Sequence, residues 1–367
     1  MEKQLTSEKW NAIETICWLP DGGGLAVTAS EPERRNTQIW YASYPGGEVR
    51  RITNDLNNYQ NVSLTADGAS LVTVLSEGTS DIWVMPAGDA SRAAQITSNR
   101  FDGVTGIAWT PDGRIVHGSR VSGNADLWIM NADGTEDRQL TANAGLNIFT
   151  KVSPDAHYVA LTSNRTGERV IWRIDIDGAN PKQLTHGVND FNPLFTLDSQ
   201  WVIFNSGSGD ETSIWKVPID GGNPVQLTDY FSTASAVSPK DGKIACGFLD
   251  ERATPRRVRT GVLAPEGGAP TAVFDFPSYF GTIGPGFYGQ VIGWTVDGRA
   301  LTYIVTKDGV SNIWSQPLDG GQPRQLTDFK SDLIIYYAWS PDGKKLALAR
   351  GSKTSDVVLI RDMTKAQ

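Results

Sequence analysis

The sequence predicts an all-β fold, an eight-bladed β-propeller of four-stranded antiparallel blades. A turn motif of the form Ser/Thr-Pro-Asp-Gly recurs along the chain, and a strand with Ile-Trp or Leu-Trp and a Gln-Leu-Thr-like tripeptide usually follow it. Successive turn aspartates are 43 to 46 residues apart, with one interval of 56; they are Asp21, Asp67, Asp112, Asp155, Asp198, Asp241, Asp297 and Asp342. Such a period is typical of propeller blades, which have four short strands each.

One copy, residues 142–185, illustrates how the four strands follow from the pattern. Short runs with alternating apolar residues at 150–152, 158–162, 170–174 and 182–185 predict strands A to D. The Pro154-Asp155 turn separates A from B, and the Asp177-Gly178 turn separates C from D. Aspartate and glycine suit tight turns through side-chain capping and positive φ, so we interpret these aspartates as turn residues rather than calcium ligands.

We expect one domain that spans residues 1–367. Its blades are predicted at about 7–53, 54–97, 98–141, 142–185, 186–228, 229–275, 276–327 and 328–362 with 1–6. The last copy ends after a third strand at 356–360, whereas Lys3-Gln4-Leu5-Thr6 resembles a fourth strand without a blade of its own. The N-terminal strand is therefore predicted to complete the last blade, which closes the ring and removes exposed sheet edges.

Composition excludes several classes of function. The chain has 33 Lys and Arg against 41 Asp and Glu, a net charge of −8, which argues against non-specific binding to nucleic acid or anionic membrane. We expect no membrane insertion and no signal peptide, because no apolar run approaches about 18 residues and the N-terminus lacks an apolar segment. The two cysteines provide neither a disulfide framework nor a metal cluster. We also expect that the protein has no cofactor and is a monomer.

The repeat consensus, roughly L-T…W-S-P-D-G…I-A…S…I-W…D-G-G…Q-L-T, resembles the TolB-type, WD40-like propeller repeat of bacteria. Residues 312–321 and 355–360 are similar to the C-terminal propeller of bacterial membrane serine/threonine kinases and related regulators. This resemblance implies a binding or sensing module of a larger signalling protein, with any catalysis on another segment. It also favours an extracytoplasmic location.

Motifs for catalysis are missing from the sequence. His117, His157 and His186 occupy unlike repeat positions, no Gly-x-Ser-x-Gly elbow occurs, and kinase signatures are absent. We therefore predict a non-catalytic ligand- or protein-binding propeller without a metal site. The alternatives are an accessory propeller of a hydrolase, or a propeller enzyme such as a polysaccharide lyase.

The connections from strand D to the next strand A combine aromatic rings with polar groups, which suits a protein, peptide or carbohydrate ligand. The alternative is that these rings only cover the ends of the blade core. A connection about ten residues longer than its counterparts, Tyr279–Tyr288, dominates this face. The candidate residues are Tyr59, Phe101, Asp102, Phe149, Asp190, Phe191, Tyr230, Phe231, Tyr279, Phe280, Tyr288 and Tyr336.

Lys151 is a further candidate because of its repeat position. The equivalent strand-A residues are small or apolar, which predicts crowding near the axis; they are Cys17, Ser63, Ala108, Leu194, Ala236, Gly293 and Ala338. A lysine at this position is predicted to line the channel and attract an anion, with extension of its ammonium group to solvent as the alternative.

Overall fold

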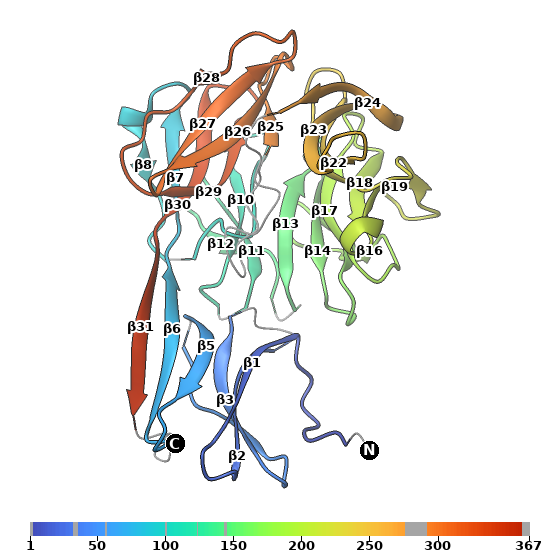
Figure 1. The fold of residues 1–367 in the computed structure, drawn as a ribbon. Coiled ribbons are helices and arrows are strands. Elements are labelled where there is room, and N and C mark those ends of the chain that lie inside the picture. The colour runs from blue at the N-terminus through green and yellow to red at the C-terminus, as the bar shows by residue number, and fades with distance from the viewer. Residues whose placement is uncertain are drawn as a thin grey trace. The chain divides into compact units, whose positions relative to one another are not determined.

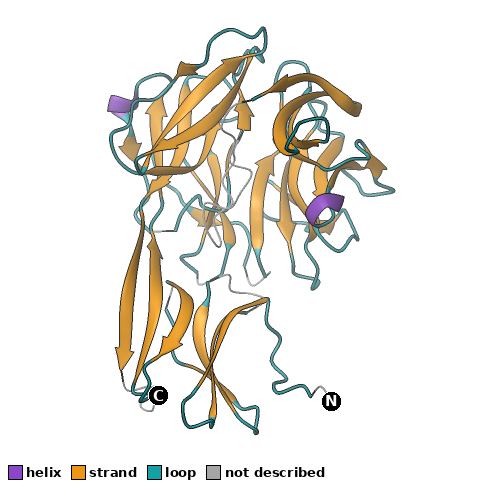
Figure 2. Ribbon diagram, in the orientation of Figure 1, coloured by secondary structure: helices purple, strands orange, loops and turns teal. Residues whose placement is uncertain are grey.

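The computed structural model describes residues 3–31, 36–55, 57–99, 101–122, 124–142, 145–275 and 292–361. Within them the regular elements are strands, apart from single 3-10 turns at Ala90–Arg92 and Gly209–Glu211 (Figure 2). The all-β prediction is therefore confirmed. The chain divides into two compact units, a smaller one of Met1–Thr79 with Ser352–Gln367 and a larger one of Ser80–Gly351.

The described part of the larger unit contains six four-stranded antiparallel sheets (Figure 1). Five consist of consecutive strands: β9 to β12 (Ile107–Trp109, Ile115–Ser119, Asp126–Met130, Arg138–Gln139), β13 to β16 (Asn147–Val152, Tyr158–Ser163, Val170–Asp175, Lys182–Gln183), β17 to β20 (Asp190–Phe195, Trp201–Ser206, Ser213–Pro218, Val225–Gln226), β21 to β24 (Ser232–Val237, Ile244–Asp250, Arg257–Ala264, Gly267–Phe274) and β25 to β28 (Ile292–Trp294, Ala300–Lys307, Val310–Pro317, Arg324–Gln325). The sixth joins β29 (Leu333–Trp339) and β30 (Lys345–Gly351) to β7 (Asp81–Pro86) and β8 (Ala94–Gln95). Strands from both ends of the larger unit thus share one sheet.

The first strands of these sheets lie around a common axis. Strand β9 contacts β13, β13 contacts β17, β17 contacts β21, β21 contacts β25, and β29 contacts β9. Between the sheets, alternating apolar residues form successive cores, such as Ala160, Val202 and Phe204 between the second and third sheets. This is the arrangement of propeller blades.

The repeated Gln-Leu-Thr-like tripeptide holds the short fourth strand in five of the six sheets of the larger unit. In the sheet of β13 to β16, Thr185 Oγ1 accepts a hydrogen bond from Ile171 N at 3.0 Å, and Gln183 Nε2 donates to Thr185 O at 2.8 Å. The threonine contact recurs in four other sheets of the larger unit, at Thr97, Thr141, Thr228 and Thr327. A strand of two residues is therefore fixed by side chains as well as by its backbone.

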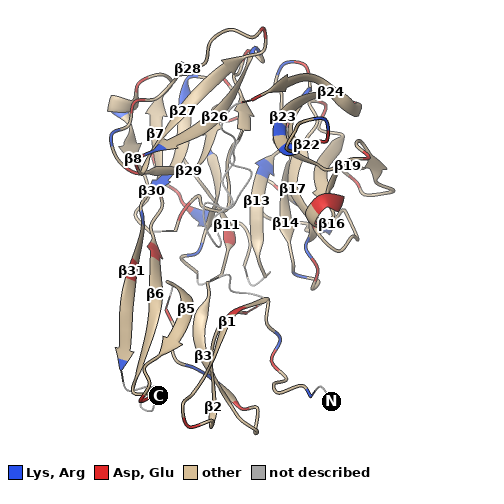
Figure 3. Ribbon diagram, viewed as in Figure 1, with Lys and Arg blue, Asp and Glu red and all other residues tan. Residues whose placement is uncertain are grey.

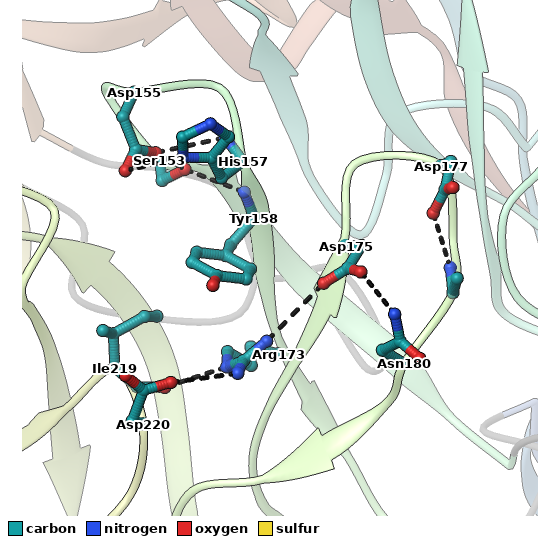
Figure 4. Close-up of polar contacts among 11 residues, drawn as sticks. Ser153, Asp155, His157, Tyr158, Arg173, Asp175, Asp177, Asn180, Ile219 and Asp220 are labelled. Carbon is teal, nitrogen blue, oxygen red and sulfur yellow. Dashed lines mark hydrogen bonds and ion pairs between the residues drawn. The ribbon is translucent and has the colours of Figure 1, made fainter.

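Arginine side chains also join neighbouring sheets. Arg173 on β15 donates to Ile219 O at 2.9 Å and pairs with Asp220 at 3.1 Å, both beyond β19 in the next sheet (Figure 4). Its guanidinium also lies 4.2 Å from the ring centroid of Tyr158 and 3.6 Å from Asp175. Its side chain is only 11% exposed, so this arginine connects two neighbouring sheets and is largely shielded from solvent.

The smaller unit holds two sheets. Strands β1 to β4 (Ala12–Trp18, Gly24–Ser30, Gln38–Ser43, Val49–Arg51) form a four-stranded sheet, and β5 (Asn58–Leu64), β6 (Ser70–Gly78) and β31 (Lys353–Arg361) form a three-stranded one. Its buried apolar residues form two clusters, one of Ala26, Ile39, Tyr59, Val62 and Leu71 and one of Val27, Ala29 and Trp40.

The predicted closure by the N-terminal strand is wrong. Residues 3–6 form no strand, and β31 pairs with β6 rather than with β30. Strand β30 pairs instead with β7, so residues 54–97, predicted as one blade, contribute to two sheets. An eight-bladed ring is accordingly not confirmed.

The pairing differs from the prediction because two strands change partners near Thr79 and Ser352. Thr79 N donates to Ser352 O at 2.9 Å, and the two hydroxyl groups are 3.2 Å apart. At this point β6 and β7 separate, and each pairs with a strand from the C-terminal part of the chain. The predicted pairing of β6 with β7 and the observed pairing with β31 and β30 both satisfy the backbone hydrogen bonds of these strands. The alternation of apolar and polar residues along the strands therefore does not select between the two pairings.

Candidate functional site: an axial cavity

The inner strands of the larger unit line an open cavity of about 290 Å³ around their axis. Every one of the six sheets contributes the residue at the strand-A position singled out in the sequence, namely Ala108, Lys151, Leu194, Ala236, Gly293 and Ala338. Small side chains at this position leave room at the centre. Lys151 is one of the residues that line this cavity, and its role in binding stays a prediction.

A ring of large apolar side chains lies one residue further along the same strands. Trp109, Phe195, Trp294 and Trp339 occupy this position in four sheets, and valines occupy it in the other two. The lining continues to the turns between strands A and B, where Pro154, Leu197, Pro239, Val296 and Pro341 take part. The cavity therefore lies toward the A–B turns, at the opposite ends of the inner strands from the D–A connections.

Two of the tryptophans are fixed by contacts between sheets. Trp109 Nε1 donates to Ala338 O at 2.9 Å, and Trp294 Nε1 donates to Ala236 O at 3.3 Å. Each indole thus bonds to the inner strand of the preceding sheet. Because an indole N–H in an apolar site needs an acceptor, these bonds hold the rings in a defined orientation beside the cavity.

Lys151 brings the only charge among the described residues that line the cavity, and Figure 3 shows the corresponding basic segment on β13. Its Nζ donates to Tyr336 Oη at 3.0 Å and lies 5.3 Å from the centroid of that ring. Tyr336 is 2% exposed and comes from β29, so the structure unites two of the residues predicted from the sequence.

The predicted candidates in the larger unit's other D–A connections are largely engaged in local structure. Asp102 is fully buried and accepts from Asn99 Nδ2 at 3.1 Å, while Asp190 accepts from Gly187 N at 3.2 Å. Tyr230 Oη donates to Gly268 O at 2.8 Å, and burial raises its pKa. Phe101 forms an isolated β-bridge with Ser80, and Phe149 packs against a cluster that includes Leu146 and Ile148. Phe191 belongs to β17, and the carbonyl of Phe231 accepts a hydrogen bond from Leu249 N.

Two groups of predicted residues stand apart from the cavity. Tyr59 belongs to the smaller unit, where its hydroxyl donates to Asp55 at 2.7 Å; burial, together with this carboxylate, raises its pKa. Tyr279, Phe280 and Tyr288 lie outside the described residues. Ligand binding at the D–A connections stays a prediction.

The three histidines occupy separate environments. His117 Nε2 is 3.1 Å from Asp137 and fully buried, the exposed His157 lies 3.3 Å from Asp155, and His186 contacts Gln183 at 3.0 Å. No group of three or more His, Cys, Asp or Glu side chains suited to a metal ion occurs within the described ranges. The same ranges contain no helix that is long and apolar enough to cross a membrane.

The sequence analysis did not predict the set of aromatic side chains around the cavity, although the sequence contains a pattern that indicates it. An aromatic residue stands two positions before the second turn residue in Trp109-Thr-Pro, Phe195-Thr-Leu, Trp294-Thr-Val and Trp339-Ser-Pro. The ring becomes apparent only when six inner strands are placed about one axis.

Comparison with known proteins identifies the class of repeat. Residues 65–240 match the TolB beta propeller domain family. The TolB homolog of Chlorobium luteolum is 24% identical over 141 residues, which cover 38% of this chain and 31% of that protein. The chain thus matches about three tenths of the length of this curated relative. The TolB-like repeat predicted from the sequence is confirmed.

Two solved structures can be aligned with this chain. TolB from Acinetobacter baumannii aligns with a TM-score of 0.48 at 15% identity and covers 94% of this chain and 66% of that one. A chain of the nidogen/laminin complex aligns with a TM-score of 0.50 at 12% identity and covers 66% of this chain and 91% of its own. At 12% identity, the likeness to the nidogen/laminin chain concerns the fold alone.

Proposed function

We propose that the larger unit is a non-catalytic binding propeller whose ligand occupies the axial cavity. The observation that carries this proposal is the convergence of all six inner strands on one apolar cavity with a single cation. A concave, mostly apolar site with few polar groups is what ligand binding requires. The unit would serve as the sensing or scaffolding part of a larger bacterial signalling protein.

The aromatic rings support binding rather than catalysis. Large rings offer area for contact at low entropic cost, and two of the tryptophans are already held in place by Ala338 O and Ala236 O. Two further polar side chains of the lining form hydrogen bonds within the protein. Tyr337 bonds to Thr302 at 2.9 Å, and Ser340 donates to Asp342 at 2.7 Å.

A thermal-shift screen tests this proposal. The purified chain is screened against peptides, sugars, cell-wall fragments, small organic acids and divalent cations with chelator controls. We expect one class to give a saturable shift, since a ligand at 100 times its Kd stabilises the native state by about 2.7 kcal/mol. The shift should disappear in Ala108→Phe, which fills the cavity, and persist in Val188→Phe, at a position 76% exposed and outside the lining.

Two outcomes would contradict the proposal. One is the absence of a saturable shift from every class. The other is a shift that Ala108→Phe leaves unchanged, which would direct attention to the D–A connections and the segment Tyr279–Tyr288. The extracytoplasmic location forms part of the proposal, and fractionation of cells that produce the tagged full-length protein tests it separately.

A further inference from the structure

The first sheet of the smaller unit, β1 to β4, leaves large apolar side chains exposed on its inner strand. Ile16 and Trp18 on β1 are 57% and 54% exposed. Cys17, which stands between them, packs against the core that joins this sheet to the second sheet of β5, β6 and β31. Because successive side chains of a strand point to opposite faces, Ile16 and Trp18 lie on the face that turns away from the second sheet.

The same repeat positions are buried in the larger unit. Before the A–B turn of the β9 to β12 sheet, Ile107 and Trp109 occupy the positions of the exposed pair in β1. Ile107 is fully buried and Trp109 is 7% exposed, in a core with Ala347 of the neighbouring sheet. The corresponding pair in β25 is buried in the same way; it consists of Ile292 and Trp294. In β1 the pair lacks the neighbouring sheet that covers it elsewhere.

The second sheet of the smaller unit has an exposed apolar face of its own. Val357 and Leu359 on β31 are 75% and 48% exposed. Their partners across the sheet are Val74 and Val72 on β6, so the apolar strip extends over two strands. Val358, between the two exposed residues, packs against the core shared with the first sheet. The strip therefore lies on the side of the second sheet that turns away from the first.

This strip resembles the surface that buries the Ile-Trp pair in the larger unit. There, the pair in β25 shares a core with a row across three strands of the preceding sheet, namely Ala236, Ala245 and Val262. The second sheet has a row with the same pairing, namely Ser63, Val72 and Leu359. Ser63 and Ala236 are equivalent strand-A residues of the repeat. The two open faces of the smaller unit thus correspond to the two sides of one contact between blades.

The smaller unit of a single copy cannot join these faces to each other. Its described part has two sheets, and the faces lie on opposite sides of the pair. In the larger unit the sheets already form a closed series, since β27 contacts β29 and β29 contacts β9. An exposed apolar surface is typical of a contact with another molecule, and a second copy supplies both matching faces.

We infer that two copies of the chain associate through their smaller units, with the Ile16 and Trp18 side of each first sheet packed on the β31 strip of the other copy's second sheet. The two contacts are equivalent by a twofold axis, and together they close a ring of four sheets. Propellers have four or more blades, and closed twofold dimers are the commonest homo-oligomers. The inference concerns the smaller unit, so it goes beyond the proposed function, and it differs from the monomer expected from the sequence.

Sedimentation velocity of the full chain tests the inference. Between about 1 and 100 µM we expect a concentration-dependent change from the mass of one chain to the mass of two. Ile16→Lys and Leu359→Glu each place a charge in both contacts of the dimer, where apolar surroundings disfavour it. Each variant should therefore raise the dissociation constant at least about 100-fold. Both positions are exposed in a single copy, so the variants are expected to fold, which circular dichroism verifies.

Mixing the two variants gives the sharper test. A mixed dimer keeps one contact made entirely of original residues, because Ile16→Lys leaves the second sheet intact and Leu359→Glu leaves the first sheet intact. In the other contact the introduced charges have opposite signs. We expect the equimolar mixture to form dimers where neither variant does so alone. Val188→Lys is the matched control, since Val188 is 76% exposed in the larger unit, and it should dimerise like the original protein.

Four results would overturn the inference. They are the mass of one chain at every concentration, a dimer that persists in either variant, a mixture that stays monomeric, and growth beyond two copies, which would show that the faces do not close a ring. None of these results bears on the axial cavity. The thermal-shift screen with Ala108→Phe tests the proposed function by itself.

Discussion

Trp109 and Ala338 are 229 residues apart in the sequence, yet the indole N–H of Trp109 donates to the carbonyl oxygen of Ala338 at 2.9 Å. This bond links β9 to β29, the inner strands of two neighbouring sheets of the larger unit. The same contact joins Trp294 on β25 to Ala236 on β21. One repeat position therefore provides both the wall of the cavity and a bond between blades.

Replacing Trp109 with phenylalanine should destabilise the larger unit by about 1–3 kcal/mol. Phenylalanine still fills part of the space of the indole, but the Ala338 carbonyl loses its donor in a partly buried site. Unfolding by urea, followed by circular dichroism, measures the loss. Trp18→Phe is the control, since Trp18 precedes an equivalent turn but is 54% exposed; equal effects of the two changes would contradict the structural role of the bond.

The turn aspartates make stability depend on pH in the acid range. Hydrogen bonds from the Thr196 and Thr295 hydroxyl groups, at 2.6 Å in both cases, and from backbone N–H groups lower the pKa of Asp198 and Asp297. The unfolded chain then binds protons more readily than the native protein does. Their contribution is therefore present above the ordinary aspartate pKa of about 4 and is lost as the pH falls through the folded-state pKa.

We expect the free energy of unfolding to decrease between pH 5 and pH 3, and to decrease less in the double variant Asp198→Asn/Asp297→Asn. Asparagine keeps an oxygen that accepts the threonine hydrogen bond but does not titrate in this range. Urea unfolding at pH 3, 4, 5 and 7 measures the difference. Parallel curves for the variant and the original protein would show that these turns do not contribute to the acid dependence.

Much of the fold was predictable because each blade is defined by local chemistry. The A–B turn uses a hydroxyl and a carboxylate two residues apart, as in Thr295 and Asp297, and the fourth strand ends in a threonine that bonds back to strand C. Both signals recur in the sequence at fixed offsets. The partner exchange of β6 and β31 was not predictable, because those strands have the same alternation as the hairpins they replace.

The candidate site was predictable only in part. Lys151 stands out in the sequence because its repeat equivalents are small or apolar, whereas Tyr336 was identified only as an aromatic residue of a connection. Their contact joins residues 185 positions apart and depends on how the sheets are arranged about the axis. A repeat pattern determines which residues point toward an axis but not which of them meet across it.

Cys246 should be inert toward thiol reagents in the native protein. It is completely buried in β22, and burial raises the pKa of its thiol to about 12, so the reactive thiolate is scarce at pH 8. Cys17 is partly exposed. Titration with Ellman's reagent should therefore detect no thiol in native Cys17→Ser and one after denaturation. Rapid reaction of the native variant would show that this core opens readily.

The exchange of strand partners near Thr79 and Ser352 gives a direct test of the architecture. In the structure Val74 on β6 lies opposite Val357 on β31. A local hairpin that turns at Thr79 and Ser80 would instead place Val74 opposite Met85, as expected if residues 54–97 formed one blade. The two arrangements thus assign different neighbours to the same residue.

Cysteine pairs distinguish these arrangements in a background of Cys17→Ser and Cys246→Ala. We expect Val74→Cys with Val357→Cys to form an intramolecular disulfide under mild oxidation, and Val74→Cys with Met85→Cys to remain reduced, because only the first pair has neighbouring backbones. Mass spectrometry of tryptic peptides without reductant identifies the bond. A disulfide in the second pair but not in the first would show that β6 and β7 form one hairpin, and would restore the blade predicted at 54–97.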